Sequence, residues 1–176
     1  MVSKFDEYKT ILIVTTLSAT AHWRNIYLKF NFFGKEILII NYDRLQKLFY
    51  FDESKYKAKA KTRKTKNKRM SHNGLAPIFD LVIWDESHKM RNNTSMRSKL
   101  GLKIQVNAKF NLYLSATAGQ NPLELSYLAP LLAKITGQKV SSMNEFEKWC
   151  RDMDLGVYKG DYGNWMWDGN DKSIKK

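Results

Sequence analysis

Four short apolar runs along the chain each give way abruptly to polar residues. They cover residues 11–14, 37–40, 81–84 and 110–114. A continuous apolar run of this length is typical of a strand that is buried on both faces of a parallel sheet. We therefore expect four strands, each followed by a polar loop.

Helical periodicity separates these runs. The apolar residues of segment 19–30 recur at the spacing of one helical face, and they are Trp23, Ile26, Tyr27 and Phe30. Further helices are predicted over residues 44–51, 94–106, 123–135 and 141–149. In the helix over residues 94–106, Thr94 or Ser95 is the predicted cap, and the inward side chains are Met96, Leu100 and Ile104.

Strand and helix alternate four times, which predicts an α/β domain whose mostly parallel sheet is flanked by helices. We assign this layered domain to residues 1–150, with an insertion at residues 55–73. Residues 151–176 form a predicted C-terminal extension that is rich in Gly, Tyr, Trp and Asp, and we expect turns or short strands there.

The polar residues that follow the four strands are predicted to share one edge of the sheet. They are residues 15–20, 41–44, 85–88 and 115–121. The carboxyl ends of parallel strands meet at one edge, and open α/β sheets bind their ligands in the crevice outside it. The sequence therefore predicts a functional site at this edge.

Two adjacent acids, Asp85 and Glu86, end the third strand and are followed by Ser87 and His88. In nucleotide hydrolases an acid at this place holds Mg²⁺, commonly through water, and a neighbouring acid can polarise the attacking water. The alternative is a strand end whose acids begin a turn or cap a helix. A metal-dependent nuclease that also uses Asp80 is a weaker alternative, because Asp80 lies about 15 Å away at the other end of the strand.

The formal net charge of +13 is concentrated in one segment. Residues 55–69 contain nine Lys or Arg and no acid. This segment, which includes Lys61, Arg63 and Lys64, is either a salt-sensitive arm that binds nucleic-acid phosphates or a solvated insertion. It lacks interleaved aromatic residues, so base stacking is not its expected mode of binding.

Composition restricts the class of protein. The apolar content of 43% fits a globular domain, and the single cysteine, Cys150, excludes an intramolecular disulfide and suits a reducing compartment. No apolar run approaches the roughly 18 residues that a membrane span needs, and we find no signal peptide. We expect a cytoplasmic protein with no membrane partner.

Several motifs follow the predicted strands in a fixed order. Asp85-Glu86-Ser87-His88 is similar to the DExH form of motif II, Ser115-Ala116-Thr117 to motif III, and residues 15–23 to motif Ia. Gln120-Asn121 is similar to the segment that follows motif III, and residues 41–43 are similar to a further motif of the same series. Over about residues 8–150 the chain resembles the first RecA-like lobe of superfamily-two helicases, most closely the Swi/Snf-type DNA translocases and their phage relatives.

The resemblance implies roles for the motif residues. Asp85 would be the Mg²⁺ ligand of an ATP site, and Glu86 would orient or activate the water that attacks the γ-phosphate. His88, Ser115, Ala116, Thr117 and Gln120 would couple that site to DNA, although RNA is not excluded. Thr15, Thr16 and Ser18 would line the nucleic-acid face. For Trp23 core packing is favoured over a place on the nucleic-acid face. For Asn121 a helix cap is as well favoured as support of the loop or a contact with nucleic acid.

Part of the family's ATP site has no counterpart here. The 176 residues contain no Gly-x-x-x-x-Gly-Lys-Ser/Thr phosphate loop and no second RecA-like lobe with its arginine finger. These groups supply much of the charge stabilisation in phosphoryl transfer. We therefore expect negligible ATP hydrolysis by the chain alone, and a complementing helicase polypeptide is a possible partner.

Two functions remain open from the sequence. The first is part of an ATP-dependent DNA helicase or duplex translocase, and the second is a non-catalytic nucleic-acid-binding or protein-docking module derived from a helicase lobe. Both predict nucleic-acid binding, so binding alone does not separate them.

Overall fold

The computed structural model describes residues 7–30, 34–49, 76–138, 143–162 and 165–168. The chain divides into two compact units. Unit 1 contains Met1–Asp85 and Lys103–Leu112, and unit 2 contains Glu86–Leu102 and Tyr113–Lys176. Each unit is described separately below. The basic segment 55–73 lies outside the described residues.

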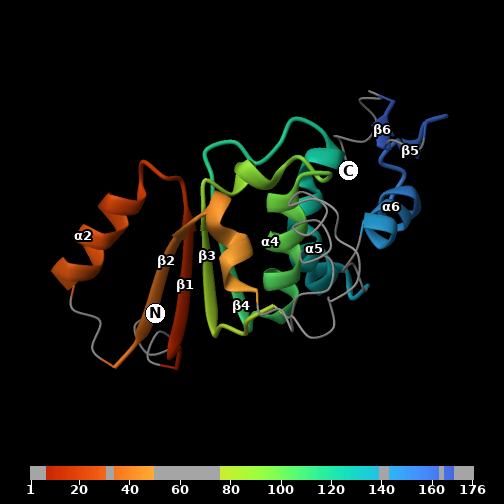
Figure 1. Cartoon of the computed structure of the whole chain (residues 1–176). Helices are drawn as coiled ribbons and strands as arrows, with labels where there is room; N and C mark the ends of the chain where they lie inside the picture. The colour runs from red at the N-terminus through yellow and green to blue at the C-terminus, as the bar shows by residue number, and fades with distance from the viewer. Residues whose placement is uncertain (1–6, 31–33, 50–75, 139–142, 163–164, 169–176) are drawn as a thin grey trace, which may run out of the picture. The chain divides into compact units, whose positions relative to one another are not determined.

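Unit 1 is built on a mostly parallel sheet with the strand order β2-β1-β3-β4 (Figure 1). The strands are β1 (Thr10–Thr15), β2 (Glu36–Asn41), β3 (Leu81–Asp85) and β4 (Phe110–Leu114). Both β2 and β3 pair with β1 in parallel, so that Ile13 is opposite Ile39 on one side and Ile83 on the other. The four strands and the α/β class predicted from the sequence are confirmed.

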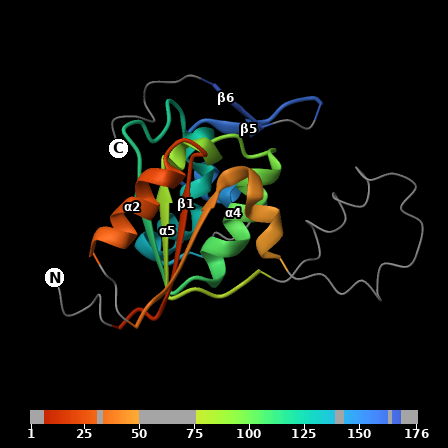
Figure 2. The same ribbon diagram turned by 60° about the vertical axis from the view of Figure 1, so that its left-hand side comes forward.

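The two faces of the sheet carry different helices. The helix α2 (Thr20–Phe30) lies on one side of the sheet, and η1 (Tyr42–Leu48) with the end of α4 (Met96–Asn107) lies on the other (Figures 1 and 2). On the α2 side, Trp23 packs on a cluster formed by Ile11, Ile13 and Leu81. The strand residues that alternate with these are fully buried, and they are Leu12, Val14, Val82 and Trp84.

Asp80 ties the starts of two strands together. Its Oδ2 accepts hydrogen bonds from the backbone N–H groups of Lys9 and Thr10, both at 2.9 Å. Its Oδ1 lies 2.5 Å from Nζ of Lys109, just before β4. Lys109 and these N–H groups hold the pKa of Asp80 well below its ordinary value, because they stabilise the carboxylate form. Asp80 therefore has a structural role at the opposite end of β3 from Asp85.

The short helix predicted over residues 44–51 is instead the 3₁₀ helix η1, Tyr42–Leu48. Oδ1 of Asn41 accepts a hydrogen bond from the N–H of Arg44 at 3.1 Å, which begins the helix directly after β2. Tyr42 and Leu45 are buried. The sequence pattern predicted a helix here but missed its tighter geometry and its earlier start.

Unit 2 is mainly helical. It contains η3 (Ser87–Met90), the first part of α4, η4 (Pro122–Leu128), α5 (Ala129–Thr136) and α6 (Met143–Asp152). An antiparallel hairpin of β5 (Val157–Lys159) and β6 (Trp165–Trp167) follows, as the tail composition predicted. The buried core of this unit consists of Ala129, Phe146, Cys150 and Val157.

Two helix predictions need correction. The single helix expected over residues 123–135 is divided into η4 and α5, because Pro130 in the first turn of α5 has no N–H to continue the hydrogen-bond ladder. Leu100 and Ile104 of α4 are buried as expected, but Met96 is 36% exposed because it is the first residue of the helix. Ser95 is the cap, and its Oγ accepts a hydrogen bond from the N–H of Ser98.

No described helix is both long enough and apolar enough to cross a membrane.

Candidate functional site

The carboxylate of Asp85 is held by two side chains of unit 1. Its Oδ2 accepts a hydrogen bond of 2.6 Å from Oγ1 of Thr15 and one of 2.8 Å from Nε1 of Trp23. The hydroxyl of Tyr42 donates to the backbone carbonyl of Asp85 at 2.9 Å. The side chain and the backbone of Asp85 are therefore both fixed at the carboxyl end of β3.

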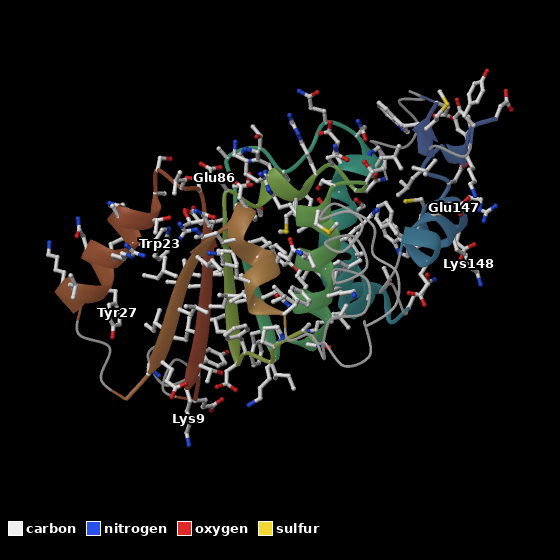
Figure 3. The ribbon with its side chains drawn as sticks, viewed as in Figure 1. Lys9, Trp23, Tyr27, Glu86, Glu147 and Lys148 are labelled. Carbon is white, nitrogen blue, oxygen red and sulfur yellow. The ribbon has the colours of Figure 1, made fainter. Side chains whose placement is uncertain are left out.

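Local structure explains why these residues meet. Val14 is opposite Trp84 in the β1–β3 ladder, so the next residues, Thr15 and Asp85, leave adjacent parallel strands side by side. Trp23 lies one turn into α2 (Figure 3). Its ring packs on the sheet while its N–H reaches the carboxylate. The predicted core packing of Trp23 is confirmed, whereas its hydrogen bond to Asp85 was not foreseen.

Thr15 was predicted to line a nucleic-acid surface, and the structure places it differently. Its side chain is fully buried (0% exposed), and its hydroxyl is bonded to Asp85. A residue with this burial cannot contact a bound duplex without a rearrangement of the strand. Thr15 therefore holds the carboxylate of Asp85 in place. In this loop only the exposed neighbours of Thr15 are accessible to a nucleic acid.

The carboxylate of Asp85 could hold a divalent metal ion through its second oxygen. Both hydrogen bonds engage Oδ2, which leaves Oδ1 available as a ligand. Among the described residues no group of three or more His, Cys, Asp or Glu side chains could hold a metal by themselves. Mg²⁺ commonly takes one or two carboxylates and completes its shell with water and phosphate oxygens, so a single acid fits that mode of binding.

Within unit 2, His88 connects the segment that follows β3 with the loop that follows β4. Its Nδ1 lies 3.1 Å from Oε2 of Glu86 and 3.1 Å from Oγ of Ser115. Oγ of Ser115 donates its hydrogen to the carbonyl of Thr117 at 2.9 Å, so it accepts from His88. This chain of hydrogen bonds requires the His88 tautomer that carries a proton on Nδ1.

Glu86 has an unusual backbone. Its φ of 54° lies in the left-handed region, which a residue with a side chain seldom adopts. This conformation ends β3 and begins η3 within one residue, and it leaves the Glu86 side chain 43% exposed. Strained backbone of this kind persists where surrounding contacts enforce it, often at functional sites. The acid is thus both accessible and held beside His88.

The family described as the SNF2-related domain matches residues 2–160. The chain belongs to this family. No curated protein matches the chain. The SNF2-related domain is a helicase-like, nucleotide-binding ATPase domain of superfamily two; its members in general use ATP with Mg²⁺ and act on DNA.

The remaining predicted site residues of this SNF2-related domain are placed as follows. Oγ1 of Thr16 lies 3.1 Å from Oγ of Ser18 at the exposed start of α2, and it accepts from the N–H of Ala19. Ala116 and Gln120 are exposed, and the N–H of Gln120 donates to Glu124. Lys61, Arg63 and Lys64 lie outside the described residues.

Asn121 resolves one of the alternatives left by the sequence. Its Oδ1 accepts a hydrogen bond from the N–H of Glu124 at 3.1 Å, and Pro122 follows at the first position of η4. The helix-cap role is therefore confirmed. Oε2 of Glu124 lies 3.9 Å from Arg91, so this part of the SNF2-related domain links the end of η3 to η4.

Proposed function

We propose that the chain supplies motifs Ia, II and III of an ATP-dependent DNA translocase or helicase. Asp85 binds Mg²⁺ through Oδ1, and Glu86 orients or activates the water that attacks the γ-phosphate. The observation that supports this most is the carboxylate of Asp85, which Thr15 and Trp23 hold on one oxygen at the ligand-binding edge of a parallel sheet.

Thr15, Trp23 and Tyr42 act as positioning residues. Phosphoryl transfer depends mainly on placement and on charge stabilisation, and a Mg²⁺ ion held by Asp85 would supply part of that stabilisation. A carboxylate that is fixed before the nucleotide arrives loses less conformational freedom on binding.

His88 transmits the state of Glu86 to the motif III loop. A change in the hydrogen bond between Glu86 and His88 alters how His88 donates to Ser115, and Ser115 in turn fixes the carbonyl of Thr117. Thr16, Ser18 and the exposed residues of the motif III loop contact the DNA backbone. Lys61, Arg63 and Lys64 add phosphate contacts that weaken with salt.

The phosphate-binding part of the ATP site comes from elsewhere in our proposal. The 176 residues carry no Gly-x-x-x-x-Gly-Lys-Ser/Thr motif, so another segment or another polypeptide provides the loop, its lysine and the arginine finger. Hydrolysis by these residues alone is then negligible. A phage or another compact genome could encode the parts separately, to act together in the cytoplasm.

Co-expression with the flanking reading frames tests this proposal. We expect an assembly that contains a Gly-Lys-Ser/Thr loop to hydrolyse ATP faster with duplex DNA than without it. Glu86→Gln should abolish turnover, because it removes the charge that polarises the attacking water. Glu36→Gln is the matched control, since Glu36 is an exposed acid at the start of β2 and should leave turnover unchanged.

Two results would contradict the proposal. The first is DNA binding without ATP turnover in every such assembly, which would favour a non-catalytic module. The second is full activity of the Glu86→Gln variant, which would exclude this acid from the chemistry.

A further inference from the structure

Unit 2 contains an apolar cavity of about 330 Å³ that motifs II and III do not use. The loop before η4 forms one wall, and α5, α6 and β6 form the others. The lining residues that matter for the argument are Gln120, Asn121, Leu132, Phe146, Trp149 and Trp167. The volume falls at the lower end of the range of small-molecule sites in proteins.

Two of the tryptophans that line this cavity carry an indole N–H group without an acceptor among the described residues. Nε1 of Trp149 and Nε1 of Trp167 are buried, and neither has a hydrogen-bond partner within the part of the chain that the structure describes. Buried donors are nearly always paired in folded proteins, and an unpaired donor is costly. Two such donors around one cavity indicate an acceptor group that the described residues do not provide.

The walls also restrict the shape of an occupant. The rings of Phe146 and Trp149 are stacked, with centroids 5.8 Å apart and planes inclined by 27°. Phe146 is fully buried, so the flat surfaces open to an occupant belong to the partly exposed rings of Trp149 and Trp167. Such rings favour a flat ligand, because ring stacking adds to the burial of apolar surface. Gly119 lets the loop pass close to η4, since a Cβ at this position would lie 3.0 Å from Cβ of Glu124 and 3.1 Å from Cδ2 of Leu125.

Charge distinguishes between classes of ligand. None of the residues that line the cavity is charged, and the polar side chains among them are the amides of Gln120 and Asn121 besides the two indoles. A phosphate or carboxylate would find no cation there. A purely apolar ligand would leave both indole N–H groups unpaired. A neutral, flat group with carbonyl or ring-nitrogen acceptors satisfies both conditions.

We propose that this cavity binds a neutral heteroaromatic group of the nucleobase class, with the indole N–H groups of Trp149 and Trp167 donating to its acceptors. Neighbouring atoms cover both nitrogens in this structure. Binding therefore includes a rotation of the indole rings, which changes their fluorescence. The site is separate from Asp85 and Glu86, and it does not depend on ATP hydrolysis.

Titration with phosphate-free nucleosides tests the proposal. Adenosine, guanosine, cytidine and thymidine are added separately to the full chain, and tryptophan fluorescence and calorimetry report binding. We expect at least one nucleoside to bind, and Trp149→Phe or Trp167→Phe to weaken it about tenfold, the loss of one hydrogen bond. Tyr162→Phe is the control, because this aromatic residue is 95% exposed and should leave the affinity unchanged.

A second experiment identifies whether the bound nucleobase belongs to a DNA strand or to a free nucleoside or nucleotide. Single-stranded oligonucleotides are compared with the same strands in which one base is replaced by an abasic site. Tighter binding of the complete strand, lost in Trp149→Phe, assigns the cavity to a base of a DNA strand. Equal binding of both strands, together with nucleoside binding, assigns it to a free nucleoside or nucleotide. Both results support the proposal.

Independent variants keep the test decisive. Leu132→Phe fills the cavity without removing a donor, and it should prevent binding even if a tryptophan variant folds poorly. Glu86→Gln should leave nucleoside binding unchanged, which separates this proposal from the function proposed above. Absence of binding for all four nucleosides at millimolar concentration, or equal affinity in the wild-type chain and both tryptophan variants, would overturn it.

Discussion

Nε1 of Trp23 donates a hydrogen bond of 2.8 Å to Oδ2 of Asp85, and this bond joins the first turns of α2 to the end of β3. The same ring packs on the apolar cluster of Ile11, Ile13 and Leu81. A tryptophan can fill both roles because its ring is apolar and its edge carries one donor. Trp23 therefore connects the core of unit 1 with the proposed Mg²⁺ ligand.

Replacement of Trp23 separates these two roles. Trp23→Phe removes the N–H and keeps a ring, and we expect the free energy of unfolding to fall by about 1–2 kcal/mol. Trp23→Ala also removes the packing, so a larger loss of about 2–4 kcal/mol is expected. Urea unfolding measures both. Equal losses in the two variants would show that the ring packing contributes little.

Thr15 provides a test with little change in shape. Thr15→Val replaces a buried hydroxyl with a methyl group, and we expect a loss of about 1–2 kcal/mol, whereas Thr15→Ser keeps the bond to Asp85 and should cost less. Because Thr15 and Trp23 share Oδ2, the double variant should show a non-additive loss in a thermodynamic cycle. Strict additivity would indicate that the two bonds are independent.

Asp80 predicts how stability depends on pH. Its folded-state pKa is depressed, so its contribution is fully present above the unfolded-state pKa of about 4 and is lost as pH falls further. We expect the midpoint of urea unfolding to decrease below about pH 4. Asp80→Asn should lower stability at pH 7 and flatten this acid-side decrease. An unchanged pH profile in the variant would exclude Asp80 as its source.

Cys150 reports on the core of unit 2. Burial, and then the charge of Glu147, raise the pKa of the Cys150 thiol to about 12. At pH 8 we expect a chromogenic disulfide reagent to modify the folded chain at least about a hundredfold more slowly than the urea-unfolded chain, since the thiolate is the reactive form. Rapid modification of the folded chain would show that α6 detaches from its core.

Much of the architecture of unit 1 could be predicted because its signals are local. The apolar runs that became β1, β2, β3 and β4 have the period and length of strands, and no distant residue is needed to recognise them. Helix types were harder to predict. The 3₁₀ geometry of η1 and the division at Pro130 depend on capping bonds and on one missing N–H, which hydrophobic periodicity does not report.

The candidate site was predictable as a set of residues but not as a network. Sequence order placed Asp85 and Glu86 at a strand end, and the motifs named His88 and Ser115. The bond between His88 and Ser115 joins residues 27 positions apart, and the bonds of Asp85 reach 62 and 70 positions back along the chain. Contacts of this range depend on strand register and side-chain rotamers.

The amino-acid sequence by itself determined the alternation of strands and helices and the acids at the end of β3. It also determined the order of motifs that suggested the protein family. These properties are local, because they follow from residue type and spacing. Only the tertiary structure decided that Thr15 and Trp23 bind Asp85. It also decided that two tryptophans lining one cavity, Trp149 and Trp167, have indole N–H groups without a partner among the described residues. Hydrogen bonds between distant residues depend on packing geometry, which becomes defined only when the chain is folded.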